Sequence, residues 1–254
     1  CAAPLWSSPC FASLSQAADF RSGQFTVFTV SLSDDLYTLG GKVVLTESVS
    51  GDLLAAGGSL IVSGAVGADL HAAGGNILVN GTVGDDLRVV GGDVTLGSRV
   101  EGDLLVYGGS VTVPAGVVVE GDAVIGAGAL NLGGTIRGDL RVDGGTVNFS
   151  GAVEGDARFS GDERVRFNGR VEGDTILTAE DVLVGPDSSF GGDVTYWRRG
   201  GEMDFGQVPV GGAARFDREL QGRERDEDAG REPLLRKGLA AVFSAYFFGT
   251  LLSG

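Results

Sequence analysis

A repeat of seventeen residues dominates the sequence and most constrains what it can fold into. Its clearest copies read V-S-G-D-L-L-A-A-G-G-S-L-I-V-S-G-A from Val49 and T-V-G-D-D-L-R-V-V-G-G-D-V-T-L-G-S from Thr82. One aspartate marks each of ten copies, at successive spacings of 17, 17, 17, 17, 19, 17, 17, 18 and 19 residues. These residues, the aspartate column, are Asp35, Asp52, Asp69, Asp86, Asp103, Asp122, Asp139, Asp156, Asp174 and Asp193. A unit this short buries its apolar side only against its neighbours, so the copies have to stack as a solenoid.

Apolar residues recur at fixed offsets from each aspartate. Leu53 follows Asp52 by one residue, the pair Leu60 and Val62 comes eight and ten residues after it, and Val66 comes fourteen after it. Inward residues spaced by two indicate short strands, and the gaps between them indicate turns. Three short strands and three turns in each copy predict an all-β fold, a triangular parallel β-helix of about ten coils within residues 20–212.

Glycine and aspartate mark the expected corners of each coil. Pairs such as Gly57-Gly58 fall between the first two strands, where we expect the backbone to bend through dihedral angles that other residues avoid. Glycine precedes the aspartate in seven of the ten copies, and a short aspartate side chain can hold a corner by accepting nearby backbone N–H bonds. The longer copies carry extra residues at 113–116, 161–164 and 185–189, which we interpret as bulged surface loops.

Several kinds of ligand and chemistry are disfavoured by the sequence. The formal net charge of -15 would repel nucleic-acid phosphates, and the only cysteines, Cys1 and Cys10, lie outside the repeats. Calcium-binding β-rolls use a nine-residue repeat with several oxygen ligands per turn, so we interpret the aspartate column as structural rather than as a metal site. We therefore expect no metal, no cofactor and no small-molecule substrate.

No catalytic constellation is visible either. His71 is the only histidine, and it shares its offset from the aspartate with Arg88, Arg141 and Arg158, which places it on the surface. The hexapeptide acyltransferases, the main enzymatic alternative, have coils of three hexads and a histidine base, and pectate-lyase-like helices have longer coils with groove loops. We expect a protein that is not an enzyme.

The two ends of the repeat region are the candidate contact surfaces. Residues 24–30 read as a strand that opens the solenoid, and Met203, Phe205, Val208 and Val210 read as a degenerate last half-coil over the core. The end coils of a β-helix expose unpaired strand edges that recruit partners unless they are capped, and the sequence leaves both outcomes open. The candidate end-contact residues are Phe25, Val27, Phe28, Val30, Val194, Tyr196 and Trp197.

The flanking segments suggest a connection to a membrane. Residues 1–19 are either the remnant of an export signal with a small-x-small site at residues 15–17, a lipoprotein-type start at Cys1, or a disordered leader. Residues 213–233 form a charged linker, and residues 234–254 hold 16 uncharged residues from Leu239, which predicts the start of a transmembrane helix. We expect the sequence to be a fragment at both ends.

The repeat resembles that of the bactofilin family of polymer-forming cytoskeletal proteins. The resemblance rests on G-D-L-x-x-x-G-G-x-V-x-V-x-G-x-V, as in residues 51–66 and 102–113, and covers about residues 32–194. It implies a right-handed β-helix that polymerises end to end without nucleotide, here in a membrane-anchored relative of bacterial type. Its expected partners are further copies of itself and the membrane.

Two questions stay open in the sequence. The first is the membrane side, because Arg236-Lys237 favours a cytoplasmic linker whereas an export signal would place the coils outside. The second is function, because an exported, adhesin-like binding module would have the same repeats as a scaffold.

Overall fold

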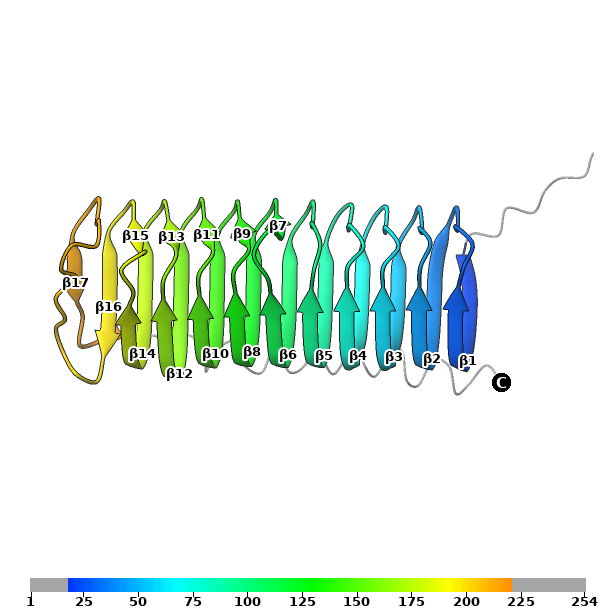
Figure 1. The fold of residues 1–254 in the computed structure, drawn as a ribbon, viewed down its shortest axis with the longest axis horizontal. Coiled ribbons are helices and arrows are strands. Elements are labelled where there is room, and N and C mark those ends of the chain that lie inside the picture. The colour runs from blue at the N-terminus through cyan, green and yellow to red at the C-terminus, as the bar shows by residue number, and fades with distance from the viewer. Residues whose placement is uncertain (1–17, 221–254) are drawn as a thin grey trace, which may run out of the picture.

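Twelve parallel strands stack into a single rod in the computed structural model, which describes residues 18–220 (Figure 1). The strands run in sequence order from β1 at one end to β17 at the other, and each pairs with the strand of the next coil (Figure 1). At a strand spacing of about 4.8 Å, twelve strands give a rod roughly 53 Å long. The predicted all-β parallel solenoid is confirmed.

One long strand runs through most of each coil. These strands are β1 (Ala18–Phe28), β2 (Asp35–Leu45), β3 (Leu53–Val62), β4 (Leu70–Val79), β5 (Leu87–Leu96), β6 (Leu104–Val113), β8 (Ala123–Leu132), β10 (Leu140–Phe149), β12 (Ala157–Phe167), β14 (Thr175–Val184), β16 (Val194–Arg198) and β17 (Ala214–Phe216). A second parallel sheet of two-residue strands forms the third side in the C-terminal half: β7 (Val118–Val119), β9 (Thr135–Ile136), β11 (Ala152–Val153), β13 (Arg170–Val171) and β15 (Ser189–Phe190). In the N-terminal half single bridges such as Val49 to Val66 take its place.

The alternating apolar pattern builds each long strand as two legs. In β3, Leu53 and Ala55 are buried on the first leg and Leu60 and Val62 on the second, with the Gly57-Gly58 pair between them. Because both legs bury alternate residues in one core, the strand has to bend at the glycines. The predicted first and second strands of each coil are therefore one continuous bent strand.

Close approach between coils explains the glycine pairs. A Cβ on Gly57 would lie 2.2 Å from the carbonyl oxygen of Gly40, and one on Gly74 would lie 2.4 Å from that of Gly57. In residues 18–220 the glycines with positive φ are Gly116, Gly201 and Gly206, none of which belongs to a pair. The expectation that the pairs need unusual dihedral angles is thus wrong, and the space between stacked coils is the reason for them.

The register repeats with the sequence period, and the irregular copies are absorbed in corners. Strand β4 pairs with β5 so that Leu70 lies beside Leu87, seventeen residues on. The extra residues form a turn after Pro114, where Gly116 has a φ of 91°, a register shift between Gly161 and Arg164, and a turn at residues 185–188. The predicted loops at 113–116 and 185–189 are confirmed as turns, whereas the extra residue at 161–164 is a bulge within the continuous strand β12 and not a loop.

The core changes character along the rod at nearly constant width. In β3 the large Leu53 at the first inward position is followed by the small Ala55, and in β12 the order reverses to Ala157 and Phe159. From β10 onward aromatic rings fill the core, with the Phe167 ring 5.0 Å from Phe149 and 4.6 Å from Phe190. The rod therefore has an aliphatic N-terminal core and an aromatic C-terminal core.

The solenoid extends beyond the predicted boundaries of 20–212. Strand β1 begins at Ala18 and is a full-length strand, and β17 lies within the segment expected to be a linker from residue 213. Leu220 is also buried. The remainder of the predicted leader (1–17), the remainder of the linker (221–233) and the predicted transmembrane segment (234–254) lie outside the described residues.

Candidate functional sites: the aspartate column and the ends of the rod

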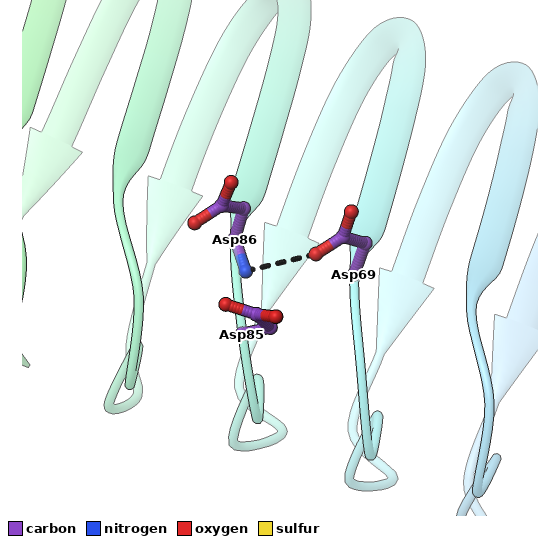
Figure 2. A group of neighbouring side chains, drawn as sticks. All are labelled: Asp69, Asp85 and Asp86. Atoms are coloured by element: carbon purple, nitrogen blue, oxygen red, sulfur yellow. Dashed lines mark hydrogen bonds between the residues drawn. The ribbon is translucent and has the colours of Figure 1, made fainter.

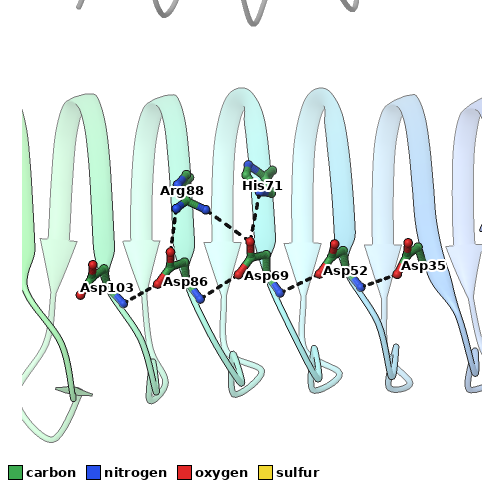
Figure 3. A network of polar contacts seen from close by, with 7 residues as sticks. All are labelled: Asp35, Asp52, Asp69, His71, Asp86, Arg88 and Asp103. Atoms are coloured by element: carbon green, nitrogen blue, oxygen red, sulfur yellow. Dashed lines mark hydrogen bonds and ion pairs between the residues drawn. The ribbon is translucent and has the colours of Figure 1, made fainter.

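The aspartate column forms a continuous hydrogen-bonded ladder along one corner of the rod. The Oδ1 atom of Asp35 accepts a bond of 2.9 Å from the backbone N–H of Asp52, and the Oδ1 of Asp52 accepts one of 3.1 Å from Asp69 (Figure 3). The same bond joins every following pair of column residues, at 2.8–3.1 Å. The ladder ends on Ala213, whose N–H donates to Asp193 at 2.8 Å. Each carboxylate thus ties its own coil to the next one rather than closing its own corner.

The glycine before each aspartate makes room for this ladder. A Cβ on Gly51 would lie 2.3 Å from the Oδ1 of Asp35, and one on Gly138 would lie 2.2 Å from that of Asp122. Three coils lack this glycine: Asp34 precedes the first column aspartate, and Ala68 and Asp85 replace the glycine in two of the coils that follow. The two hydrogen bonds that follow these residues are the longest in the ladder, at 3.1 Å each. A side chain at this position therefore pushes the coils slightly apart at the corner.

Cationic side chains neutralise part of the column. Arg88 spans two coils, with its guanidinium 2.6 Å from Asp86 Oδ2 and 3.4 Å from Asp69 Oδ2 (Figure 3). His71 lies on the same outward face with its Nε2 3.8 Å from Asp69 Oδ2, and its side chain is 40% exposed. These contacts offset the repulsion between stacked carboxylates, which is about 1 kcal/mol per pair in water at contact distance. His71 is therefore a surface residue beside the aspartate column.

Within residues 18–220, the one group of three acidic side chains with closely spaced oxygens consists of Asp69 and Asp86 of the column and the adjacent Asp85 (Figure 2). One oxygen of each lies within 4.8 Å of the others. The Oδ1 of Asp69 is already used by the N–H of Asp86, and Arg88 holds the Oδ2 of both Asp69 and Asp86. The cluster therefore carries its own counter-ion, and a metal ion would have to displace the Arg88 guanidinium.

The N-terminal end of the rod presents an open strand with apolar side chains. Strand β1 pairs with β2 along one edge, and its other edge has no strand beside it among the described residues. Phe20, Phe25, Val27 and Val30 are 59%, 65%, 42% and 71% exposed. The Lys42 ammonium lies 5.9 Å from the centre of the Phe25 ring. This end is the largest gathering of exposed apolar side chains in residues 18–220.

The inward positions on the first leg of β1 are polar, whereas Phe28 on the second leg is buried. Asp19 and Arg21 stand beside Leu36 and Thr38, which are buried in the next coil. The Arg21 guanidinium bonds the Asp19 carboxylate at 2.9 Å, and this bond and the carboxylate's charge raise the pKa of Arg21 above its usual value. An ion pair thus covers the end of the apolar core while the strand edge beside it stays open.

The C-terminal end is closed by the chain itself. Residues 199–213 loop back over the last coil, and Val210 bridges Phe190. The Phe205 ring packs 5.4 Å from Tyr196 and 6.1 Å from Phe190. The Tyr196 hydroxyl accepts from the N–H of Met203 at 3.0 Å and donates to its carbonyl at 3.4 Å. The prediction that Met203, Phe205, Val208 and Val210 cover the core is confirmed by their packing against it.

The predicted end-contact residues separate into two groups. Phe25, Val27 and Val30 are exposed at the N-terminal end, whereas Phe28 points into the core and is 6% exposed. Val194 and Tyr196 are 0% and 3% exposed, because β17 and residues 199–213 lie beyond them. Trp197 is half-buried. Val194 and Tyr196 are therefore core residues rather than an end surface.

Sequence reasoning missed three residues at the ends. Phe20 lies outside the predicted strand of residues 24–30, although it has the same offset in its coil as Tyr37 in the next. Phe216 was assigned to the linker, yet its ring lies 5.6 Å from Tyr196. Asp19 was assigned to the leader. A test for the repeat offsets upstream of the first aspartate would have found Phe20 and Asp19.

A shallow pocket of about 340 Å³ lies between β13 and β15 on the third side. Arg170, Glu172 and Phe190 contribute to its lining, and the Arg170 guanidinium bonds the Glu172 carboxylate. The Glu172 carboxylate in this pocket is thus already paired with the Arg170 guanidinium beside it.

No family model, no curated protein and no solved structure matches this chain in the comparisons with known proteins. Within residues 18–220 there is also no helix of the length and apolar character needed to span a bilayer.

Proposed function

We propose that the protein is a non-enzymatic structural scaffold: a β-helical rod of bactofilin type that self-associates through its ends and is tethered to a membrane by residues 234–254. The open edge of β1, flanked by exposed Phe20, Phe25 and Val27, is the observation that carries this proposal. A long unpaired strand edge beside apolar side chains is a template for another chain.

The surface chemistry of the rod supports a structural role. Outward charges pair with one another from coil to coil, as Arg137 does with Glu120 at 2.8 Å and Arg164 with Asp181 at 3.0 Å. Together with the aspartate column, these ladders use charged groups to hold neighbouring coils in register. The sole histidine, His71, lies beside the column with its Nε2 facing the Oδ2 of Asp69. Such an arrangement stabilises a rod and leaves its ends as the distinctive surfaces.

Sedimentation and electron microscopy of the full chain over a range of concentrations test the self-association. We expect species larger than the monomer that grow in population with concentration. A monomer at every concentration would refute self-association and would leave the rod as a binding module instead.

Vesicle flotation tests the tether separately. The full chain should float with phosphatidylcholine vesicles, and a Phe247→Asp variant should float much less, because a carboxylate in a spanning segment is costly. Equal flotation of the two proteins, or none of either, would contradict the tether.

A further inference from the structure

We propose that two rods join through their first coils about a twofold axis and that assembly stops at this pair. The inference rests on the self-association proposed above and limits the contact to the N-terminal end of each rod. It follows from the difference between the ends and from the symmetry of strand β1.

The two ends differ in what they offer a partner. Strand β1 has eleven residues and one free edge, and four of the five exposed large apolar side chains of residues 18–220 belong to its coil. Strand β17 has three residues, and the core beneath it is covered by Phe205 and Phe216. Very short edge strands and covering loops are the devices by which proteins prevent pairing at a sheet edge. A second copy can therefore add at β1, while the far end gives no comparable edge.

The bend in β1 makes its edge self-complementary. Residues 18–22 form the first leg, residues 24–28 form the second, and Gly23 lies at the bend, in register with Gly40. A twofold axis through the bend and perpendicular to the rod exchanges the two legs and reverses their direction. The first leg of one copy then runs antiparallel to the second leg of its partner, so both legs are paired at once.

This symmetry fixes which side chains meet. With the axis between residues 23 and 24, Phe20 lies opposite the partner's Val27, and Ser22 lies opposite the partner's Phe25. Opposed residues of an antiparallel pair point to the same face, and all four occupy outward positions of their coils. Phe20 and Val27 thus cover each other across the pair, and Phe25 lies against the small side chain of Ser22. Asp19 and Arg21 remain paired within each copy, so no isolated charge is buried.

The closed pair is also favoured by charge. The chain carries a formal net charge of -15, so two copies repel each other along most of their length. Joining the rods by their N-terminal ends places the bulk of each rod at the greatest distance from the other. The near-neutral first coil, in which Asp19 is balanced by Arg21, is the part that meets.

Charge substitution at one opposed pair tests the arrangement in the full chain. Phe20→Lys with Val27→Lys sets like charges opposite each other and should raise the dimer dissociation constant at least about a hundredfold. Phe20→Lys with Val27→Glu sets opposite charges at the same two places and should restore dimers. Leu183→Lys, on an exposed apolar residue of β14, is the matched control and should dimerise like the parent.

Disulfide trapping tests the register directly. In a chain with Cys1→Ser and Cys10→Ser, the double variant Phe20→Cys and Val27→Cys should form covalent dimers on oxidation, because opposed Cα atoms lie about 4.5–5.5 Å apart. Phe20→Cys alone should not, since its two copies would sit on different legs.

The outcomes separate this inference from the proposed function. Dimers with the charge pattern above support the pair. Filaments longer than two rods would overturn it while leaving self-association intact. Dimers that ignore all charge variants would place the contact elsewhere and would also overturn it. A strictly monomeric protein would refute the proposed function as well.

Discussion

The ladder along the aspartate column predicts an unusual sign for a glycine-to-alanine substitution. In Gly51→Ala the new Cβ would lie 2.3 Å from the Oδ1 of Asp35, so the carboxylate has to shift and its bond from the N–H of Asp52 is weakened. Loss of a hydrogen bond to a charged group costs about 1.5–3 kcal/mol. Alanine returns about 0.4–1 kcal/mol by restricting the unfolded chain. Because complete loss of the bond is the upper limit, we expect a net loss of up to about 2.5 kcal/mol, where a glycine without such a contact would give a gain.

The adjacent coil supplies the matched control. Ala68 occupies the equivalent position there, and the hydrogen bond from Asp69 to Asp52 is already 3.1 Å long. Ala68→Gly should shorten this bond while loosening the unfolded chain, so its stability should stay within about 0.5 kcal/mol of the parent.

Urea unfolding and hydrogen exchange at the Asp52 amide measure the effect. Exchange at this amide should accelerate in Gly51→Ala and in Asp35→Ala. Because both substitutions act on the same bond, their effects in the double variant should fall well short of the sum. The reasoning would be refuted by a stabilising Gly51→Ala, or by effects that add in full.

Three further predictions concern the side chains along the rod. Burial raises the pKa of Tyr107 above its usual value, and the charge of Asp143 raises it further. The fold therefore favours the protonated phenol, so the contribution of Tyr107 to stability is intact below a pH of about 10 and is lost as the pH rises above it. When the pH is raised from about 9.5 to 11, the free energy of unfolding measured in urea should fall less in Tyr107→Phe than in the parent protein. An equal fall in the two proteins would contradict this. Phe167→Ala should cost about 3–5 kcal/mol, against under about 0.5 for the exposed Leu183→Ala, and comparable urea midpoints would count against the core assignment. Phe205→Ala should speed hydrogen exchange at the Tyr196 amide and not at the Leu53 amide; uniform exchange would show that Phe205 does not act as a local cover.

The sequence period was sufficient to predict the coils because each inward position repeats with apolar residues. Leu53, Leu60 and Val66 are all buried as their offsets require. The second leg of β1 lies in the predicted strand of residues 24–30, but its first leg escaped prediction for a physical reason: the inward positions there hold Asp19 and Arg21, which do not follow the apolar pattern. A capping coil is polar where the others are apolar, so the signal that finds the interior fails at its end.

The hydrogen-bonded ladder along the aspartate column could not be predicted from any single copy of the repeat. Asp52 suggested a local corner bond because a short carboxylate commonly bonds the backbone near it in sequence. In the fold its Oδ1 atom reaches the N–H of Asp69, seventeen residues away. The role of Gly51 depends on the same contact, since only the stacked coil brings the Asp35 carboxylate against it. Both features belong to the interface between coils, which one copy of the repeat does not contain.

The strict register of the rod has a consequence for how its length can change in evolution. A duplication or deletion of seventeen residues restores every ladder bond and changes the length by one strand spacing, about 4.8 Å. Any other indel misplaces the inward side chains unless a corner absorbs it, as the corners at Pro114, Gly161 and Gly185 do. The length of the rod can thus change in evolution by whole coils, without any change to either end.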